Sequence, residues 1–273
     1  MDIASLKNKP IDVHTHVFPD ALAKKAMDVL LSETPEVRNY SDGTHAGLIA
    51  QMDEAGVGRA VAAKVATKPS QMEAIFRFSA ELKDDPRLIP FPSIFPTAPD
   101  TTQWIDRAVK EGFIGIKIHP QYQGCPADDP HTIELVKVAR DAGLVILIHA
   151  GDDFAFPGDK RASPARLAYL LDQVGEVKII AAHMGGWMVW DEVLELLAGR
   201  EHLYFDTSMV FSYSTKETML ELIEKHGVDR VMFGTDSPWD DISRERQRID
   251  SLGLSKEDTE KILWENAQKV FGV

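Results

Sequence analysis

Histidine and aspartate side chains stand at the ends of several apolar segments of this chain. His14 and His16 are two residues apart in Asp-Val-His-Thr-His, and His149, His183 and Asp236 each follow an apolar run. Residues two apart on a strand face the same side, so the first two imidazoles can share one ion. Three imidazoles and one carboxylate suit zinc, and also manganese, iron or cobalt. The pattern predicts a divalent metal site in which Asp236, touching both ion and water, acts as the general base.

The same position recurs along the chain. His119, His149 and His183 end successive segments, and Asp236 follows about two segments later. The alternative for each of these residues is a buried polar group with its own partner inside the protein. Four further histidines lie in predicted helices or loops, and we expect structural roles for them: His45, His131, His202 and His226.

Eight short apolar segments alternate with amphipathic ones, which indicates parallel strands covered by helices. The predicted strands are Ile11–Phe18, Arg59–Ala66, Leu88–Phe95, Phe113–Pro120, Val145–Gly151, Lys178–Gly185, Leu203–Met209 and Val231–Ser237. The predicted helices are Thr44–Ala55, Ser70–Lys83, Thr101–Glu111, Thr132–Ala142, Ser163–Gln173, Asp191–Leu197, Thr215–Lys225 and Lys256–Phe271. This alternation predicts an α/β fold, a single-domain (β/α)8 TIM barrel over residues 1–273. An open doubly wound sheet is the alternative, but the chain has no glycine-rich loop after its first strand.

The composition limits the classes of molecule that this protein is expected to bind. The net charge of −13, from 30 basic and 43 acidic residues, argues against nucleic acid and anionic membranes. Cys125 is the only cysteine, which excludes an intramolecular disulfide or a thiolate cluster. The first ten residues are polar and unlike a signal peptide, so the cytoplasm is the expected compartment. We expect a small-molecule substrate and leave a homo-oligomeric assembly open.

With these motifs the chain resembles the amidohydrolase superfamily, in particular its amidohydrolase-related branch of metal-dependent TIM-barrel hydrolases and decarboxylases. The resemblance runs through Asp-Val-His-Thr-His, Gly-Ile-Lys-Ile-His-Pro, Ile-His-Ala-Gly, Ala-His-Met-Gly-Gly and Phe-Gly-Thr-Asp-Ser-Pro. It implies that one ion is held by His14, His16, His149 and Asp236, and from these donors we expect zinc first. It also implies that His183 is either a ligand of a second ion or the residue that polarises the substrate.

Lys117 leaves two alternatives open. In binuclear relatives a lysine at this place is carboxylated and bridges two ions, and His119 and His183 would then belong to a second metal or to substrate binding. In mononuclear relatives the bridge is missing, and Lys117 is an ammonium that pairs with Asp206, a substrate carboxylate or another acceptor. We expect one ion per chain.

Substrate-binding candidates surround the predicted barrel mouth. Lys64 and Arg161 could receive an anionic group, and Lys160 and Arg166 lie nearby in sequence. Trp187 and Trp239 each follow a site motif and could wall an apolar pocket. Asp206 and Ser208 are expected to line the mouth as well.

Three functions compete. The first is a hydrolase in which activated water attacks an ester, lactone or amide, Asp236 takes the proton and His183 stabilises the oxyanion. The second is a non-oxidative decarboxylase of a small aromatic or unsaturated acid. The third, a barrel that keeps the ion but not the chemistry, is disfavoured by the complete ligand set. We favour hydrolysis over decarboxylation by a small margin.

Overall fold

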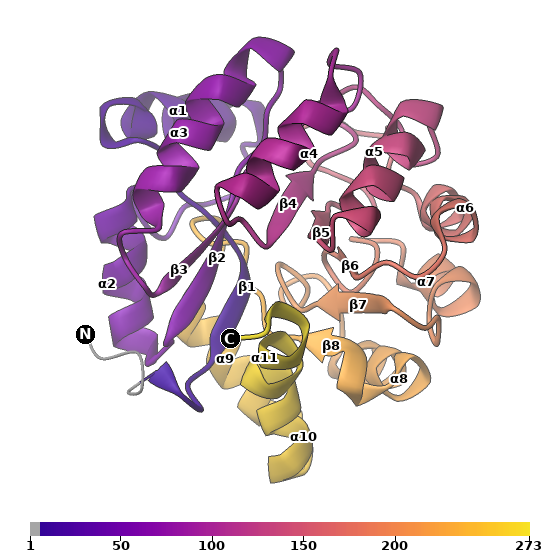
Figure 1. Ribbon diagram of the computed structural model, residues 1–273. Coiled ribbons are helices and arrows are strands. Elements are labelled where there is room, and N and C mark those ends of the chain that lie inside the picture. Colours follow the sequence, from indigo (N-terminus) through magenta and orange to yellow (C-terminus); the bar gives the residue numbers. More distant parts are fainter. Residues whose placement is uncertain (1–5) are drawn as a thin grey trace.

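The computed structural model describes residues 6–273, and across them eight parallel strands form a barrel surrounded by helices (Figure 1). The strands are β1 (Ile11–His16), β2 (Arg59–Ala63), β3 (Leu88–Phe91), β4 (Gly115–Ile118), β5 (Val145–Ile148), β6 (Ile179–Ala181), β7 (Leu203–Asp206) and β8 (Val231–Met232). They are hydrogen-bonded in sequence order as β1–β3 and β4–β8. Single bridges between Ser93 and Lys117, and between Thr15 and Ser237, join the two groups. The predicted TIM barrel is confirmed.

Each strand ends earlier than the sequence predicts. β5 stops at Ile148 and β6 at Ala181, so His149 and His183 stand just beyond the last paired residues. The chain leaves the ladder there because the loops at this end turn their side chains toward a common centre.

The strand residues divide their side chains between two apolar layers. Ile146 and Ile148 on β5 pack outward against the helices, whereas Val145 and Leu147 point into the barrel. Phe271, near the C-terminus, packs with the inner layer. This alternation explains why the strands read as continuously apolar: both of their faces are buried.

The helices connect the strands and cover them (Figure 1). They are α1 (Asp20–Glu33), α2 (His45–Ala55), α3 (Met72–Leu82), α4 (Thr101–Lys110), α5 (Pro130–Asp141), α6 (Pro164–Val174), α7 (Trp190–Leu196), α8 (Lys216–His226), α9 (Ile242–Ser251), α10 (Lys256–Glu260) and α11 (Asn266–Phe271). Short 3-10 turns lie at Pro69–Gln71 and Val228–Arg230. Within the described chain, no helix has the length and apolar character needed to cross a membrane.

The sequence analysis did not predict α1 and α9. It also predicted one continuous helix where the structure has α10 and α11. α1 has no side-chain cap at its start, whereas α9 begins after an N-cap aspartate, Asp241, a signal that the sequence analysis did not use. The expected helix Lys256–Phe271 contains a π-helical turn at Lys261–Glu265. α1 matters for function because it forms one wall of the site cavity.

Candidate metal centre

A β-bulge in β1 turns His14 and His16 toward the barrel interior. Asp12 pairs with Ala60 but Thr15 with Ala62, so β1 has one extra residue between them. Such a bulge shifts the following side chains to the other face of the strand. Both imidazoles therefore reach the inner face, as predicted, although an unbroken alternation from Ile11 would have pointed them outward.

The hydrogen bonds of His16 fix which ring nitrogen is free. Its Nδ1 lies 3.1 Å from the carbonyl oxygen of Ala63, to which only an N–H can donate. The neutral ring therefore has a lone pair at Nε2. That atom lies 2.9 Å from Oδ1 of Asp236, which is also an acceptor.

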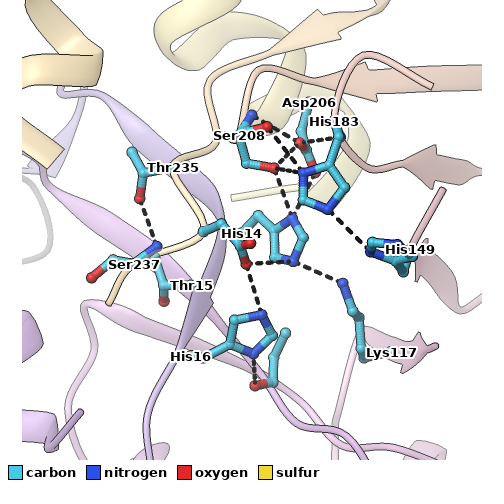
Figure 2. Close-up of polar contacts among 12 residues, drawn as sticks. His14, Thr15, His16, Lys117, His149, His183, Asp206, Ser208, Thr235 and Ser237 are labelled. Atoms are coloured by element: carbon cyan, nitrogen blue, oxygen red, sulfur yellow. Dashed lines mark hydrogen bonds and ion pairs between the residues drawn. The ribbon is translucent and has the colours of Figure 1, made fainter. Parts of the chain in front are cut away.

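His14, like His16, has a hydrogen-bond acceptor at Nδ1 and faces Asp236 with Nε2 (Figure 2). Its Nδ1 lies 3.0 Å from Oδ2 of Asp206 and 3.1 Å from Oγ of Ser208. The carboxylate accepts the Nδ1 proton, so the neutral ring has its lone pair at Nε2, 3.3 Å from Oδ1 of Asp236. Burial, followed by the charge of Lys117, lowers the pKa of His14 to about 4 and keeps the ring neutral.

Three acceptors therefore converge at one point: Nε2 of His14, Nε2 of His16 and Oδ1 of Asp236. They lie within 4.8 Å of one another at the buried end of the barrel mouth. Acceptors that face one another need a proton or a cation between them, and two imidazoles with a carboxylate suit a divalent metal. The carboxylate partner behind His14 is the arrangement that orients metal-binding histidines in many sites. The residues present therefore fit a metal ion.

Lys117 reaches the same point from β4. Its side chain is fully buried, and its Nζ lies 2.7 Å from Nε2 of His14 (Figure 2). Burial lowers the pKa of Lys117 to about 8, while the carboxylates of Asp236, Asp206 and Asp153 oppose that shift. Of the acceptors that the sequence analysis left open for Lys117, the structure shows another acceptor in place of Asp206: the ammonium donates to the ring of His14.

His183 and His149 form a second pair of facing acceptors. Nδ1 of His183 lies 3.0 Å from the carbonyl oxygen of Ser208, and Nε2 of His149 lies 3.2 Å from that of Asp152. Each ring thus donates to the backbone and, when neutral, keeps a lone pair on its other nitrogen. These two nitrogens lie 3.1 Å apart (Figure 2). One proton or one cation between them would satisfy both.

His149 makes its side-chain contacts with residues other than His14, His16 and Asp236. Its ring stacks on that of His119, with centroids 4.1 Å apart and planes at 6°. Nε2 of His119 lies 3.4 Å from Oδ2 of Asp153, and His119, His149 and Asp153 form a second group of converging ligand atoms. Asp153 was not predicted from the sequence, because it lies in a loop with several other acidic residues. The assignment of His149 to one ion with His14, His16 and Asp236 stays a prediction.

Asp206 lies behind the site and holds its parts together. The sequence analysis expected Asp206 to line the mouth, but the residue is fully buried. Oδ2 faces Nδ1 of His14, and Oδ1 accepts from the backbone N–H of His183 at 2.9 Å and of Ser208 at 3.0 Å. Burial alone would raise the pKa of Asp206, but His14, His183 and Ser208 lower it overall, well below its usual value.

The backbone at two site residues is in the left-handed region, with φ of 60° at His183 and 65° at Asp236. This conformation is unfavourable for side chains with a Cβ and persists where surrounding contacts enforce it. The N–H of His183 is held by Asp206, and the N–H of Asp236 donates to the carbonyl oxygen of His14 at 2.8 Å. The strained turns thereby aim both side chains at the centre.

A cavity of about 630 Å³ opens onto these residues. His14, His16, His119, His149, His183, Lys117 and Asp236 lie in its lining. Of the substrate-binding candidates, Lys64, Trp187 and Trp239 line it, but Arg161 does not. Arg161 pairs with Asp159, Lys160 with Asp152 and Arg166 with Asp128, so the expected basic cluster is neutralised locally.

The four remaining histidines lie outside this centre, as expected. His226 is buried between Phe205 and the backbone, with its ring stacked at 3.7 Å. His45, His131 and His202 face carboxylates of Asp85, Asp129 and Glu176.

Residues 11–273 match the family model described as Amidohydrolase. A curated relative, gamma-resorcylate decarboxylase from a Polaromonas species, is 27% identical over 139 residues. That match spans 44% of this chain and 43% of the relative, so the chain aligns with less than half of it.

Solved structures with the same fold cover nearly the whole chain. A 2,6-dihydroxybenzoate decarboxylase from Rhizobium has a TM-score of 0.73 at 19% identity, covering 97% of this chain and 98% of its own. A manganese complex of 5-carboxyvanillate decarboxylase from Novosphingobium aromaticivorans has a TM-score of 0.73 at 16% identity, with coverages of 99% and 97%. A proposed 2-pyrone-4,6-dicarboxylic acid hydrolase from Pseudomonas putida has a TM-score of 0.71 at 17% identity, with coverages of 98% and 98%. At these identities the likeness establishes the fold.

Proposed function

The chain belongs to the amidohydrolase family, and on that premise we propose that it is a metal-dependent hydrolase. Its substrate is a small molecule with an ester, lactone or amide bond and a carboxylate. The observation that carries the proposal is the convergence of the free Nε2 atoms of His14 and His16 on Oδ1 of Asp236. This donor set lies at the base of a cavity large enough for an organic substrate.

The ion would be held by His14, His16 and Asp236, with His149 as the fourth proposed ligand. Zinc is our first choice for two or three imidazoles and a carboxylate, and manganese, iron and cobalt suit the same donors. When bound, a divalent ion supplies a lowered pKa for water and polarises a substrate oxygen.

Asp236 is the proposed general base. Both neighbouring imidazoles face its Oδ1, and within residues 6–273 no hydrogen bond engages Oδ2. Burial raises its pKa, but a positive charge beside Oδ1, from protonated His14 or His16, outweighs that effect and holds the pKa well below its usual value. The carboxylate is thus ionised and lines the cavity, where its second oxygen can accept a proton from attacking water.

His183 is the proposed proton carrier to the substrate. Its Nδ1 donates to the carbonyl oxygen of Ser208, so only the imidazolium has an N–H at Nε2. Stabilising a developing oxyanion, as the sequence analysis proposed, therefore requires a ring that has taken up a proton. We infer that His183 receives the proton that Asp236 takes from the attacking water, and donates it to the substrate oxygen or leaving group.

Lys64 is the proposed receptor for the substrate carboxylate. Its side chain is buried, and its Nζ donates to the carbonyl oxygen of Val17 at 2.7 Å. No carboxylate lies within ion-pair distance of this Nζ in the part of the chain that the structure describes. Burial lowers the pKa of Lys64 well below its usual value, because a buried ammonium without a counter-ion is costly. A substrate anion in the cavity would supply the missing counter-ion of Lys64.

Decarboxylation is the second candidate, and the relatives favour it. Several similar proteins act on aromatic carboxylates, and Lys64 could bind such a group. In this reaction the bond to the carboxyl carbon breaks, CO2 leaves and a proton is added to the ring carbon. That proton would have to come from His183, because Asp236 is held ionised. We keep hydrolysis as the first proposal, because an ionised Asp236 suits the role of a general base.

One ion per chain remains our proposal. The alternative is a carboxylated Lys117 bridging two ions, and the facing nitrogens of His149 and His183 are where a second ion would find ligands. Carboxylation requires a neutral amine, which the lowered pKa of Lys117 makes accessible near pH 8.

The deciding experiment combines metal analysis with product analysis. The protein is prepared with zinc or manganese and incubated with lactones, esters and amides bearing a carboxylate, and separately with hydroxybenzoates. Hydrolysis products from the first set, without CO2 release from the second, are expected. Release of CO2 alone would replace the hydrolase by the decarboxylase, and no turnover in the metal-loaded protein would end both.

A further inference from the structure

The site cavity extends well beyond the metal centre. From His16 it continues between α1 and α3, where most of its lining is apolar. We call this part the apolar chamber, with walls formed by Leu22, Ala26 and Leu30 of α1 and by Ile75 and Phe78 of α3. Both helices lie on the same side of the barrel in Figure 1.

α1 has two apolar stripes with different neighbours. Ala23 and Met27 are buried against the body of the protein. Leu22, Ala26 and Val29 are spaced three to four residues apart, so they form a second stripe, and all three line the cavity. Leu22 is 55% exposed and Val29 46% exposed. A helix that only covers the barrel needs the first stripe and not the second.

α3 presents a matching surface. Its core stripe, which includes Met72 and Phe76, is buried. Ile75 and Phe78 lie outside this stripe and face the cavity instead. The chamber is therefore bounded on both sides by side chains that the fold itself leaves incompletely buried.

Charge is confined to the two ends of the chamber. At the inner end the Nζ of Lys64 lies 4.7 Å from the ring centre of Phe78. At the rim Lys25 of α1 lines the cavity and is exposed. An occupant that suits this surface has an apolar body with an anionic group at its inner end.

We propose that the apolar chamber receives the body of the substrate, so that the enzyme acts on amphipathic carboxylates with an extended alkyl or aryl portion. The reacting bond would lie at His16 and Asp236, which rests on the proposed function. Cavities that bury drug-sized ligands measure roughly 300–1,000 Å³, and the 630 Å³ here falls within that range. The cationic group of Lys64 at the inner end of the cavity suits a small amphipathic anion.

The first test measures binding without turnover. The probe is 1-anilinonaphthalene-8-sulfonate, an aromatic anion, displaced by straight-chain alkanoates from butanoate to decanoate. The variant Ala26→Phe fills the chamber, and Ala21→Phe is the matched control, since Ala21 is exposed on the same helix outside the lining. Thermal melting of both variants shows that each is folded.

We expect the probe to bind the wild type and Ala21→Phe alike and to bind Ala26→Phe at least tenfold more weakly. Alkanoate affinity should rise about fourfold per methylene, the equivalent of about 0.8 kcal/mol per buried CH2. Equal binding by the two variants, or affinity independent of chain length, would overturn the proposal. Probe release on self-association, seen by light scattering, would assign the chamber to a second copy and overturn it too.

The second test separates this inference from the proposed function. Kinetics are measured for lactones with side chains from methyl to octyl. If no substrate turns over while the displacement series behaves as expected, the proposed function fails and the chamber stands. If short lactones turn over with a KM that longer side chains do not lower, the hydrolase stands and the chamber proposal fails.

Discussion

Oδ2 of Asp206 lies 3.0 Å from Nδ1 of His14, in the fully buried layer behind the metal centre. This contact decides which nitrogen of His14 is free. Because the carboxylate accepts the Nδ1 proton, the lone pair stands at Nε2 and faces Asp236. A residue that touches neither ion nor substrate thus prepares a ligand.

We expect Asp206→Asn to weaken metal binding about 10- to 100-fold, as loss of a partner behind a metal-binding histidine commonly does. The amide removes the charge that orients His14 and weakens the contact to the N–H of His183. Titration of the metal-free protein against a chelator of known affinity measures this. Ser208→Ala, which leaves the carboxylate in place, is the control. Unchanged affinity in Asp206→Asn would show that the tautomer of His14 does not depend on Asp206.

We expect His183→Asn to keep its metal and lose most turnover, because His183 carries a proton and is not counted among the ligands of the first ion. Metal content by mass spectrometry and kcat on the identified substrate are measured together. His16→Asn is the comparison, and it should lose metal as well. Loss of metal in His183→Asn would make His183 a ligand and support the second ion.

We expect Lys64→Met to raise KM for carboxylate substrates by roughly 30-fold or more, since loss of one partner of a buried charge pair costs about 2 kcal/mol or more. The same change should raise the Tm of the free protein, because it removes a buried ammonium that has no counter-ion. Arg161→Met, whose guanidinium pairs with Asp159 outside the cavity, is the control and should change neither. An effect of equal size in both variants would remove Lys64 as the specific receptor.

Lys117 should be unmodified in the active enzyme, with one equivalent of metal per chain. A metal on Nε2 of His14 would displace the ammonium from that nitrogen, and the carboxylates of Asp236 and Asp206 then attract it. Metal titration of activity gives the stoichiometry, and 13C NMR after addition of labelled bicarbonate reports a carbamate. Two equivalents of metal at full activity, together with a carbamate resonance, would establish the binuclear centre. The barrel and the role of Asp236 would be unaffected.

His226 should make the stability depend on pH. Burial, followed by the charge of Arg230, lowers its pKa from 6.5 to about 3. Between these values the unfolded state binds a proton that the folded state does not. Stability from this residue is therefore fully present above pH 6.5 and is lost as the pH falls toward 3, by up to about 1.4 kcal/mol per pH unit. Urea unfolding of the wild type and His226→Gln at pH 7.5, 6 and 5 measures the difference in slope. Equal slopes would contradict the prediction.

The sequence by itself determined the barrel and the positions of its polar strand ends. Segments such as Val145–Ile148 are apolar on both faces, which only a strand buried on two sides requires. A histidine or aspartate directly after such a segment falls at the barrel mouth whatever the packing details are. The positions of His149, His183 and Asp236 could therefore be predicted from local pattern alone.

The tertiary structure decided how these residues meet, because the deciding contacts join segments far apart in the chain. The bulge that turns His14 inward is defined by pairing with β2, and the proton on its Nδ1 by Asp206 on β7. Arg161 was expected at the mouth, but its guanidinium forms an ion pair with the carboxylate of Asp159, two residues away. α1 has no side-chain cap that marks its start. The function of its second apolar stripe can be recognised only because the stripe faces α3 across the cavity. The spacing of apolar residues shows which face of a helix or strand is buried. It does not show which residues lie opposite that face across a cavity.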